Sequence, residues 1–261
     1  MGWKNELDLR DWLKRVAPRL GSDRVLRWDD GLRDEDGSGA CVALLDSGLC
    51  WSHPVFCGAI IRARDFTGCR DLRDPTGHGT ANASLLVGQG NGWIRGLVPG
   101  SSLLFAKVLG LANRRTAVRA IARGIHWAVS QRADVIVLPF GASRGSTHIA
   151  RAIRRAAASG CALFAAAGNR GPDEICFPAW HLDVTAVSSL DSDGKSQSRC
   201  CGREDVDIFA PGEDVPAVWP DGRAFLQGSS PATVLTAGVR TLLCAAAHKR
   251  LGARPQHDRP D

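Results

Sequence analysis

The most constraining feature of this sequence is a set of short apolar runs that show no alternation between polar and apolar residues. Residues 40–45 read Ala-Cys-Val-Ala-Leu-Leu, and residues 134–138 and 161–167 are similar. A strand of this kind has to be covered on both faces, as in parallel sheets that carry helices on each side. Segments with helical periodicity, such as residues 116–131, separate the runs. The order predicts an α/β fold with a doubly wound, mostly parallel sheet flanked by helices on both faces, in three layers.

The other expected elements follow the same rhythm along the chain. Strands are expected at residues 60–66, 102–109, 183–188 and 205–209, and helices at 81–87, 149–158 and after residue 230. Residues 1–37 are expected to form an N-terminal extension with one amphipathic helix that packs on the main body. Residues 38–250 are expected to form one domain, and residues 251–261 a frayed C-terminal tail.

Composition argues against several classes of protein. No run reaches the roughly 18 consecutive apolar residues of a membrane helix. The N-terminus lacks the apolar core of a secretory signal, so we expect a cytoplasmic protein with no membrane partner. The nine cysteines form no CxxC pair and no zinc-like cluster, so we expect reduced thiols and no metal or cofactor. The net charge of +6 is modest, and with basic and acidic residues interspersed we expect no nucleic-acid partner.

Four polar residues stand where a predicted strand ends or a predicted helix begins: Asp46, His78, Asn169 and Ser230. A parallel sheet gathers such positions along one edge. An aspartate there can fix the tautomer of a histidine, which can take the proton of a serine that attacks a carbonyl group. The Ser230 backbone amide, at a helix N-terminus, can bind the resulting oxyanion. The chain order Asp, His, Ser fits a nucleophilic triad.

Each of these residues also has a structural explanation when it is taken alone. Asp46 could begin a turn, and a serine before an apolar helix is most often an N-cap. His78 is flanked by Gly77 and Gly79, and these glycines are expected to keep side-chain bulk away from the imidazole. Taken together, the four residues favour the catalytic interpretation.

The segments that carry these residues resemble motifs of the subtilisin-like (subtilase) serine proteases. Val-Ala-Leu-Leu-Asp-Ser-Gly at 42–48 and Gly-His-Gly-Thr at 77–80 are similar to the aspartate and histidine motifs of that family. Ala-Ala-Ala-Gly-Asn at 165–169 and Gly-Ser-Ser-Pro-Ala at 228–232 are similar to its oxyanion-hole and serine motifs. The resemblance runs from about residue 38 to residue 246. It implies a subtilisin-like fold for the domain at 38–250 and serine endopeptidase activity.

The resemblance also implies a role for each site residue. Ser230 would be the nucleophile, His78 the general base and then acid, Asp46 its orienting partner, and Asn169 the side-chain donor to the oxyanion. A peptide or protein substrate would be added as a strand. The residues implied to line its cleft are Leu138, Pro139, Phe140, Gly141, Ala166, Ala167 and Gly168, with Cys176 near the base of the primary pocket. A compact cytoplasmic member could process a particular precursor peptide.

The sequence departs from the family pattern beside two of the motifs. Pro231 replaces the usual Met, and proline is tolerated in the first turn of a helix. Asn82 and Ser84 fall in a stretch where the family has His-Val-Ala-Gly, and Ser84 adds bulk in place of glycine. Many secreted members bind calcium through an acidic residue after His-Pro, but Val55 stands there, so no calcium is expected. The altered flanks leave one alternative open, a catalytically inactive subtilase-fold peptide-binding module.

Overall fold

The computed structural model describes residues 5–16, 24, 26, 29–197, 199–202 and 204–252. A seven-stranded sheet forms its centre, and each neighbouring pair of strands is parallel. The strands are β2 (Cys41–Asp46), β3 (Ile60–Asp65), β5 (Ser102–Lys107), β6 (Val135–Leu138), β7 (Ala162–Ala166), β8 (Thr185–Leu190) and β9 (Ile208–Pro211). Their order in space is β3-β5-β2-β6-β7-β8-β9. The predicted parallel α/β sheet is therefore confirmed.

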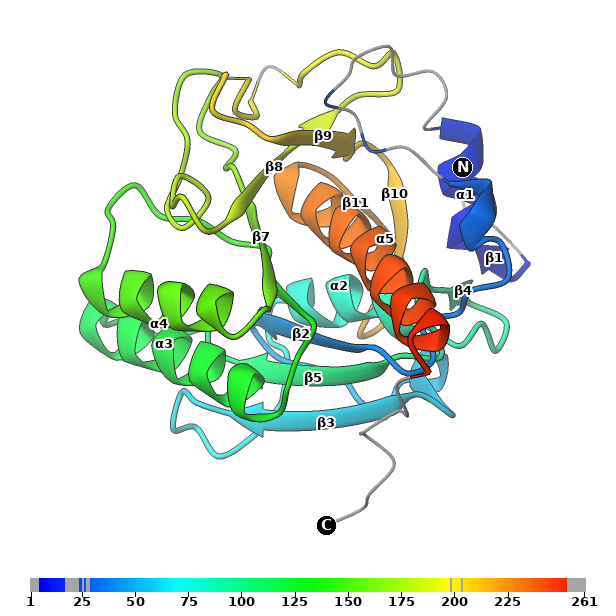
Figure 1. Ribbon diagram of the computed structural model, residues 1–261, viewed down its shortest axis with the longest axis horizontal. Coiled ribbons are helices and arrows are strands. Elements are labelled where there is room, and N and C mark those ends of the chain that lie inside the picture. The colour runs from blue at the N-terminus through cyan, green and yellow to red at the C-terminus, as the bar shows by residue number, and fades with distance from the viewer. Residues whose placement is uncertain are drawn as a thin grey trace.

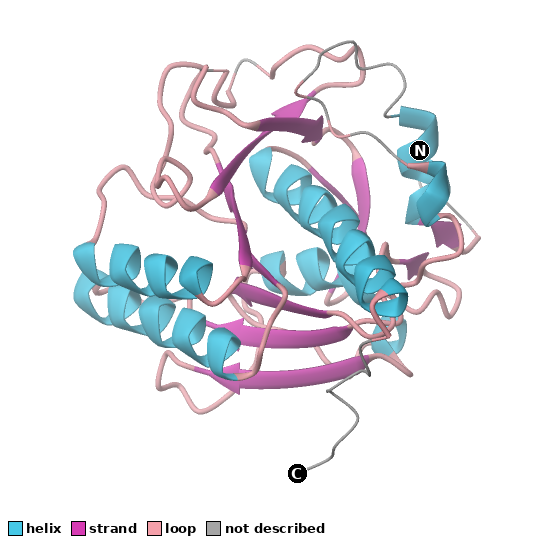
Figure 2. Cartoon of the chain, in the orientation of Figure 1, coloured by secondary structure: helices cyan, strands magenta, loops and turns pink. Residues whose placement is uncertain are grey.

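Helices cover both faces of this sheet (Figures 1 and 2). The helices α3 (Arg114–Ser130) and α4 (Thr147–Ala158) form one layer, while α2 (His78–Val87) and α5 (Ser229–Arg250) belong to the other. Leu44 packs in the core on the α2 and α5 side, and its neighbour Leu45 packs on the α3 and α4 side. Because successive side chains of a strand point to opposite faces, this double burial explains why β2 contains no polar alternation.

Several short elements were not predicted from the sequence. They are the hairpin β10 (Val215–Trp219) and β11 (Gly222–Leu226), the strands β1 (Leu7–Asp8) and β4 (Ile94–Arg95), and the 3₁₀ helices η2 (Asp30–Leu32) and η3 (Pro54–Phe56). Pro216 lies inside β10, and proline usually argues against a strand. It is tolerated here because β10 and β11 form a two-stranded antiparallel ribbon, in which each strand has a free edge.

The N-terminal helix α1 (Leu9–Val16) packs on the main body, as the sequence suggested. Leu9 and Leu13 are fully buried in the core cluster that also contains α2 and α5 residues. Residues 1–4 and 17–23 and the predicted frayed tail from 253 onward lie outside the described residues. Among the described helices, α5 has the length and apolar character to cross a membrane, but 67% of its most apolar window is buried inside the protein. That burial is typical of the core helix of a globular protein.

Candidate active site

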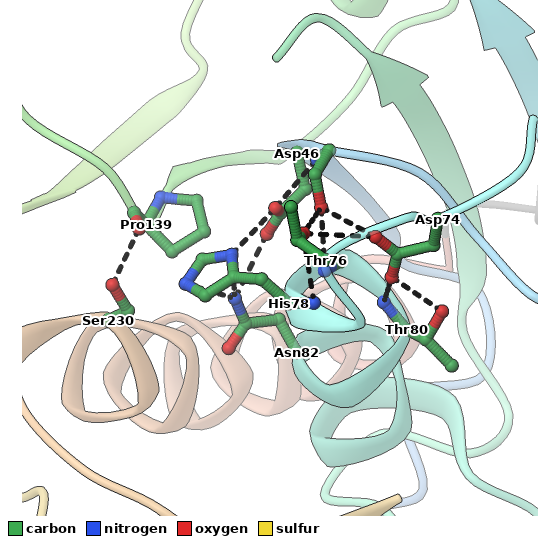
Figure 3. Close-up of polar contacts among 10 residues, drawn as sticks. Asp46, Asp74, Thr76, His78, Thr80, Asn82, Pro139 and Ser230 are labelled. Atoms are coloured by element: carbon green, nitrogen blue, oxygen red, sulfur yellow. Dashed lines mark hydrogen bonds and ion pairs between the residues drawn. The ribbon is translucent and has the colours of Figure 1, made fainter. Parts of the chain in front are cut away.

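The polar residues picked out in the sequence lie at the edge of the sheet where β2 and β6 end. Asp46 is the last residue of β2, and His78 is the first residue of α2. Ser230 lies in the first turn of α5, and its hydroxyl contacts Pro139, the residue after β6. Figure 3 shows these side chains together, with the His78 ring between Asp46 and Ser230. The fold therefore gathers residues that are far apart in the sequence.

Asp46 holds one edge of the His78 imidazole. The His78 Nδ1 lies 2.7 Å from Asp46 Oδ1, which also accepts a hydrogen bond of 2.7 Å from the Ser47 backbone amide. Since an ionised carboxylate only accepts hydrogen bonds, the proton lies on Nδ1. The neutral imidazole then presents an unprotonated Nε2, the tautomer that a general base requires.

The protonation of His78 is set by opposing effects. Burial of the ring lowers the pKa of His78, whereas the charge and hydrogen bond of Asp46 and the charge of Asp74 raise it. The attraction to the carboxylates prevails, so the pKa of His78 lies above its ordinary value of 6.5. Any reaction that needs neutral His78 therefore loses rate as the pH falls through this raised pKa.

Asp74 is tied to the beginning of α2. Its Oδ2 accepts hydrogen bonds from the Thr80 backbone amide at 2.8 Å and the Thr80 hydroxyl at 2.7 Å. Its Oδ1 accepts a hydrogen bond of 2.8 Å from the Ser47 hydroxyl. The Ser47 oxygen accepts in turn from the Gly79 amide at 3.1 Å. Asp74 and Ser47 thus fix α2 relative to β2, and with it the distance between His78 and Asp46.

We expect Asp74→Asn to shift the acid limb of kcat/KM to lower pH. The side-chain oxygen of an asparagine can still accept the hydrogen bonds from Thr80. Its NH₂ group can donate to the Ser47 hydroxyl, which accepts as well as donates hydrogen bonds. The contacts of Asp74 are therefore kept, and its negative charge is lost. A pH profile of kcat/KM measures the shift. Asp221→Asn, at an exposed turn, is the matched control and should leave the limb in place. An unmoved limb in Asp74→Asn would show that Asp74 does not influence His78.

Asn82 is a site residue to which the sequence analysis gave no role. It is fully buried, and its Nδ2 donates a hydrogen bond of 2.9 Å to Asp46 Oδ2, the oxygen that His78 does not use. Its Oδ1 is buried and has no partner among the described residues. The position follows from helical spacing, because Asn82 is four residues after His78 and faces the same way. The available signal was a polar amide in a stretch from 81 to 87 whose only other polar residue is Ser84.

The two glycines around His78 are required by contacts with other segments of the chain. A Cβ on Gly77 would lie 2.1 Å from the Trp219 ring, and Gly77 also has a left-handed φ of 72°. A Cβ on Gly79 would lie 2.2 Å from the Gly48 carbonyl oxygen. These contacts with other segments are a requirement for glycine that the sequence did not reveal, and the expectation that the two glycines clear space for the imidazole stays a prediction. They let α2 approach β10 and the end of β2 closely.

Ser84 stands where the family usually has glycine, and its hydroxyl is accommodated by two hydrogen bonds. Its hydroxyl donates to the Ala81 carbonyl at 2.7 Å and accepts from the Val218 amide at 3.1 Å. Because the side chain is fully buried, both contacts satisfy polar groups that would otherwise be costly to bury. Ser84 thereby joins α2 to β10 without disturbing the position of His78.

Ser230 is half-buried, and its hydroxyl makes no hydrogen bond to His78. Its Oγ donates a hydrogen bond of 2.6 Å to the Pro139 carbonyl oxygen. In Figure 3 the His78 ring nitrogen farther from Asp46 points toward Ser230. The structure therefore brings Asp46 and His78 into contact and places Ser230 on the open side of the ring, without the second hydrogen bond of a triad. A change of the Ser230 rotamer would redirect the hydroxyl, and such contacts often tighten only with substrate.

Asn169 lies beside the start of α5, where the resemblance implies an oxyanion donor. Its Oδ1 accepts hydrogen bonds of 3.0 Å from both the amide and the hydroxyl of Ser229, and one of 3.1 Å from the Cys200 thiol. These donors fix the orientation of the amide, so the opposite atom, Nδ2, remains available. A Cβ on Gly228 would approach Nδ2 to 2.7 Å, which explains the glycine there. Cys200 is a further supporting residue that the sequence did not reveal.

The residues implied to line the cleft divide into two groups. Leu138, Ala166 and Ala167 are buried, and the Ala167 backbone already bonds to Val187 and Cys176. Because they are buried in this way, their side chains are not accessible to a bound peptide. Phe140 and Gly141 are the more exposed members, and no backbone hydrogen bond involving them is recorded within the described chain. They are therefore the groups best placed to pair with an added strand.

Pro139 and Gly168 are also engaged within the protein. The Pro139 carbonyl accepts from Ser230, and the Gly168 amide donates to the Ser229 hydroxyl at 3.3 Å. Cys176 fills the space between the two walls of the cleft, because a Cβ on Gly141 or Gly168 would come within 2.5 Å of its side chain. The buried Cys176 side chain therefore packs against Gly141 and Gly168, and its place at the base of a substrate pocket stays a prediction.

The segment that binds calcium in many secreted subtilases has a different set of contacts here. The Asn91 amide donates to the Pro54 and Cys57 carbonyls, each at 3.1 Å, so these oxygens are already satisfied. The Glu6 carboxylate accepts from the Gly92 amide at 3.0 Å. No cluster of metal-binding side chains occurs in the part of the chain that the structure describes. The absence of calcium remains a prediction: a chelator should leave the Tm unchanged, and a large drop would contradict it.

Comparison with known sequences gives a consistent result. A sequence profile of the Subtilase family matches residues 37–256. The Major intracellular serine protease of Bacillus subtilis (strain 168) is 32% identical over 228 residues, which cover 83% of this chain and 70% of that protein. Thermitase of Thermoactinomyces vulgaris is 33% identical over 214 residues, covering 80% of this chain and 76% of the relative.

Solved structures give the same result for the fold. The Prenylagaramide maturation protease PagA superposes with a TM-score of 0.74 at 28% identity, covering 87% of this chain and 82% of its own. The Patellamide maturation protease PatA superposes with a TM-score of 0.74 at 29% identity, covering 85% and 83%. A family profile that spans most of the chain and relatives above 30% identity lead to one conclusion. The chain belongs to the subtilase family.

Proposed function

We propose that this protein is a serine endopeptidase in which Ser230, His78 and Asp46 act as nucleophile, general base and orienting carboxylate. The observation that carries the assignment of roles is the 2.7 Å contact between His78 Nδ1 and Asp46 Oδ1. It leaves the Nε2 of the ring directed toward Ser230 (Figure 3). Its relatives are named serine proteases, and nothing in the comparisons supports the inactive alternative.

The proposed reaction has two stages. His78 Nε2 takes the proton of Ser230 as Oγ bonds to the scissile carbonyl carbon, and the carbonyl oxygen becomes an oxyanion held by Asn169 Nδ2 and the Ser230 amide. The C–N bond then breaks, and His78 returns the proton to the leaving amine. Water repeats the sequence on the acyl-enzyme and frees Ser230. To begin, the Ser230 hydroxyl has to leave the Pro139 carbonyl and turn to His78.

Asn169→Ala is expected to lower kcat by about 10²- to 10³-fold, the cost of removing one side-chain donor to an oxyanion. KM should barely change, because the donor is aimed at charge that develops only in the transition state. Steady-state kinetics on a peptide substrate measure both quantities. Cys200→Ala removes one donor to Asn169 Oδ1 but leaves Nδ2 in place, and it serves as the control with a much smaller loss. A raised KM with unchanged kcat in Asn169→Ala would assign it to substrate binding.

A fluorophosphonate probe tests the proposed function without knowledge of the substrate. Such a probe reacts with a serine that is activated by a neighbouring base. We expect peptide mapping to find the label on Ser230, and His78→Ala to abolish labelling. Labelling that persists in His78→Ala, or that falls on Ser229 instead, would contradict the assignment.

The substrate class and the place of action are narrower proposals. The neighbours PagA and PatA are maturation proteases, which supports a role for this chain in processing a specific precursor peptide. None of the nine cysteines, all of which are described in the structure, forms a disulfide, and Cys57 and Cys69 are exposed, as suits a reducing compartment. One relative is named an intracellular serine protease. We therefore propose that the protein acts on a peptide or protein substrate in the cytoplasm.

A further inference from the structure

The layer formed by α3 and α4 has an unusual distribution of charge. Residues 110–160 contain nine arginines and a single acidic residue, Asp134, with no lysine or glutamate. This segment therefore carries more positive charge than the +6 of the whole chain. The expectation that basic and acidic residues are interspersed throughout the sequence is wrong for this segment.

All nine arginines of this segment are exposed. Arg115, Arg119 and Arg123 follow one another at four-residue intervals on α3, and Arg151 and Arg155 do so on α4. Like charges at this spacing destabilise a helix. Within the described residues, no ion pair joins an arginine of α3 or α4 to an acidic side chain. Helix stability therefore does not explain the pattern.

The two helices lie against each other on one face of the sheet (Figure 1). Because their arginines are all exposed, we treat them as one charged surface. We call the exposed arginines of α3 and α4 the arginine face: Arg114, Arg115, Arg119, Arg123, Arg151, Arg154 and Arg155. Its charge affects a neighbouring group. Burial lowers the pKa of His126 on α3, and the charge of Arg155 lowers it further.

The arginine face is continuous with the proposed substrate cleft. An apolar pocket of about 180 Å³ lies between the two helices and the cleft residues Phe140 and Gly141. Arg114 and Arg144 are part of its lining, and the Arg114 guanidinium donates a hydrogen bond of 2.9 Å to the Gly145 carbonyl. A polypeptide that leaves the cleft past Phe140 therefore reaches the pocket first and the arginine face next.

We propose that the arginine face binds an acidic segment of the polypeptide substrate, on the side of the scissile bond that leaves the cleft past Phe140. This inference rests on the proposed endopeptidase function. Arginine pairs with carboxylates through two parallel hydrogen bonds, and a surface of one charge speeds the encounter with an oppositely charged partner. A polypeptide is favoured over a nucleic acid because the face adjoins the peptide cleft and because the exposed residues of α3 and α4 include no Trp, Phe or Tyr for base stacking. The exposed Trp180 lies beside the pocket, next to Phe177.

Binding and cleavage are measured separately. The probes are two fluorescein-labelled peptides with the same cleavable core, one extended on both sides by glutamates and the other by glutamines. Anisotropy with Ser230→Ala protein gives Kd, and active protein gives kcat/KM. The test variant changes Arg115, Arg119, Arg151 and Arg155 to Gln. The control variant removes four charges elsewhere by changing Arg70, Lys195, Arg240 and Arg250 to Gln, and thermal unfolding confirms that both variants fold.

We expect the glutamate peptide to bind about tenfold more tightly than the glutamine peptide at low salt, with the preference lost at high salt. The test variant should lose the preference, and the control variant should keep it. A peptide with glutamates on one side only identifies the side that reaches the face. Equal Kd values for the two peptides, or equal loss in both variants, would overturn the inference.

Competing partners give further outcomes that would overturn it. Tighter binding of a single-stranded oligonucleotide or of anionic phospholipid vesicles through the same arginines would assign the face to another class of partner. Absence of cleavage of both peptides by active protein would contradict the proposed function, whereas the Kd comparison would still decide whether the face binds acidic peptides.

Discussion

Ser230→Ala is expected to lower kcat by about 10⁶-fold, the order of loss when the serine or the histidine of a triad is removed. The Ser230 hydroxyl lies on the open side of the His78 ring and at the start of α5, where its own amide can bind the oxyanion (Figure 3). The remaining rate would come from Asn169 and from substrate binding, which do not depend on the nucleophile. Steady-state kinetics with a peptide substrate measure the loss.

The neighbouring serine provides a matched control. Ser229 is buried, its hydroxyl donates to Asn169 Oδ1 at 3.0 Å, and it accepts from the Gly168 amide at 3.3 Å. Ser229→Ala removes these two hydrogen bonds, each worth about 1 kcal/mol, so we expect a loss of about 30-fold or less. Ser229→Thr keeps the hydroxyl and should lose less still. A larger loss in Ser229→Ala than in Ser230→Ala would mean that the nucleophile is misassigned.

Asp46→Asn is expected to lower kcat by about 10⁴-fold, the cost of presenting the histidine with the wrong partner. The amide can direct its NH₂ group at His78, which favours the tautomer with the proton on Nε2 and removes the base. In the other orientation the NH₂ group faces Asn82, and the His78 cation that forms during the reaction loses the negative charge beside it. Kinetics above the pKa of His78 isolate this loss from simple protonation.

The fold should survive this substitution, because Asn82 can adapt to it. In the unchanged protein, Asn82 Oδ1 has no partner among the described residues. Rotation of the Asn82 amide by about 180° would place this oxygen where Nδ2 lies, so that it can accept a hydrogen bond from the NH₂ group of the new asparagine. Thermal unfolding checks that the Asp46→Asn protein is folded. Asp74→Asn is the comparison, since it removes a carboxylate from the same network but leaves the Asp46–His78 contact. Similar losses in the two variants would contradict a special role for Asp46.

Much of the framework could be predicted because burial leaves a direct mark on the sequence. The β2 run from Cys41 to Leu45 is apolar throughout, since helices cover both faces of the sheet. A polar residue directly after such a run has to lie at the carboxyl edge of the sheet, so Asp46 could be placed there without coordinates. His78 and Ser230 could be placed by the same argument at the starts of their helices.

The rest depends on contacts between segments that no local pattern reports. Asn82 on α2 donates a hydrogen bond to Asp46 on β2. The sequence shows only that Asn82 is one of the polar residues of α2 and does not show its partner. Residue 77 has to be a glycine because a Cβ there would clash with the Trp219 ring. Trp219 belongs to β10, a strand that was not predicted because it contains Pro216. The Ser230 hydroxyl bonds to Pro139 instead of His78, and a rotamer of this kind cannot be read from spacing.

The charge pattern is an intermediate case. The nine arginines between residues 110 and 160 are visible in the sequence, but their alternation with apolar residues gives the appearance of ordinary solvated helices. Only the packing of α3 against α4 shows that the seven arginines of the arginine face lie on neighbouring helices, and only the pocket beside Phe140 connects this surface with the cleft. The significance of the pattern therefore depends on tertiary structure.

The central claim is that Ser230 and His78 act as one catalytic unit, and a double-mutant comparison tests it most directly. The measurement is kcat for Ser230→Ala, His78→Ala and the variant with both changes, on one peptide substrate at one pH. If the two residues act together, the double variant should be no slower than either single variant, because the unit is already lost after the first change. Losses that multiply in the double variant would show that the two side chains act independently and would contradict the proposed triad.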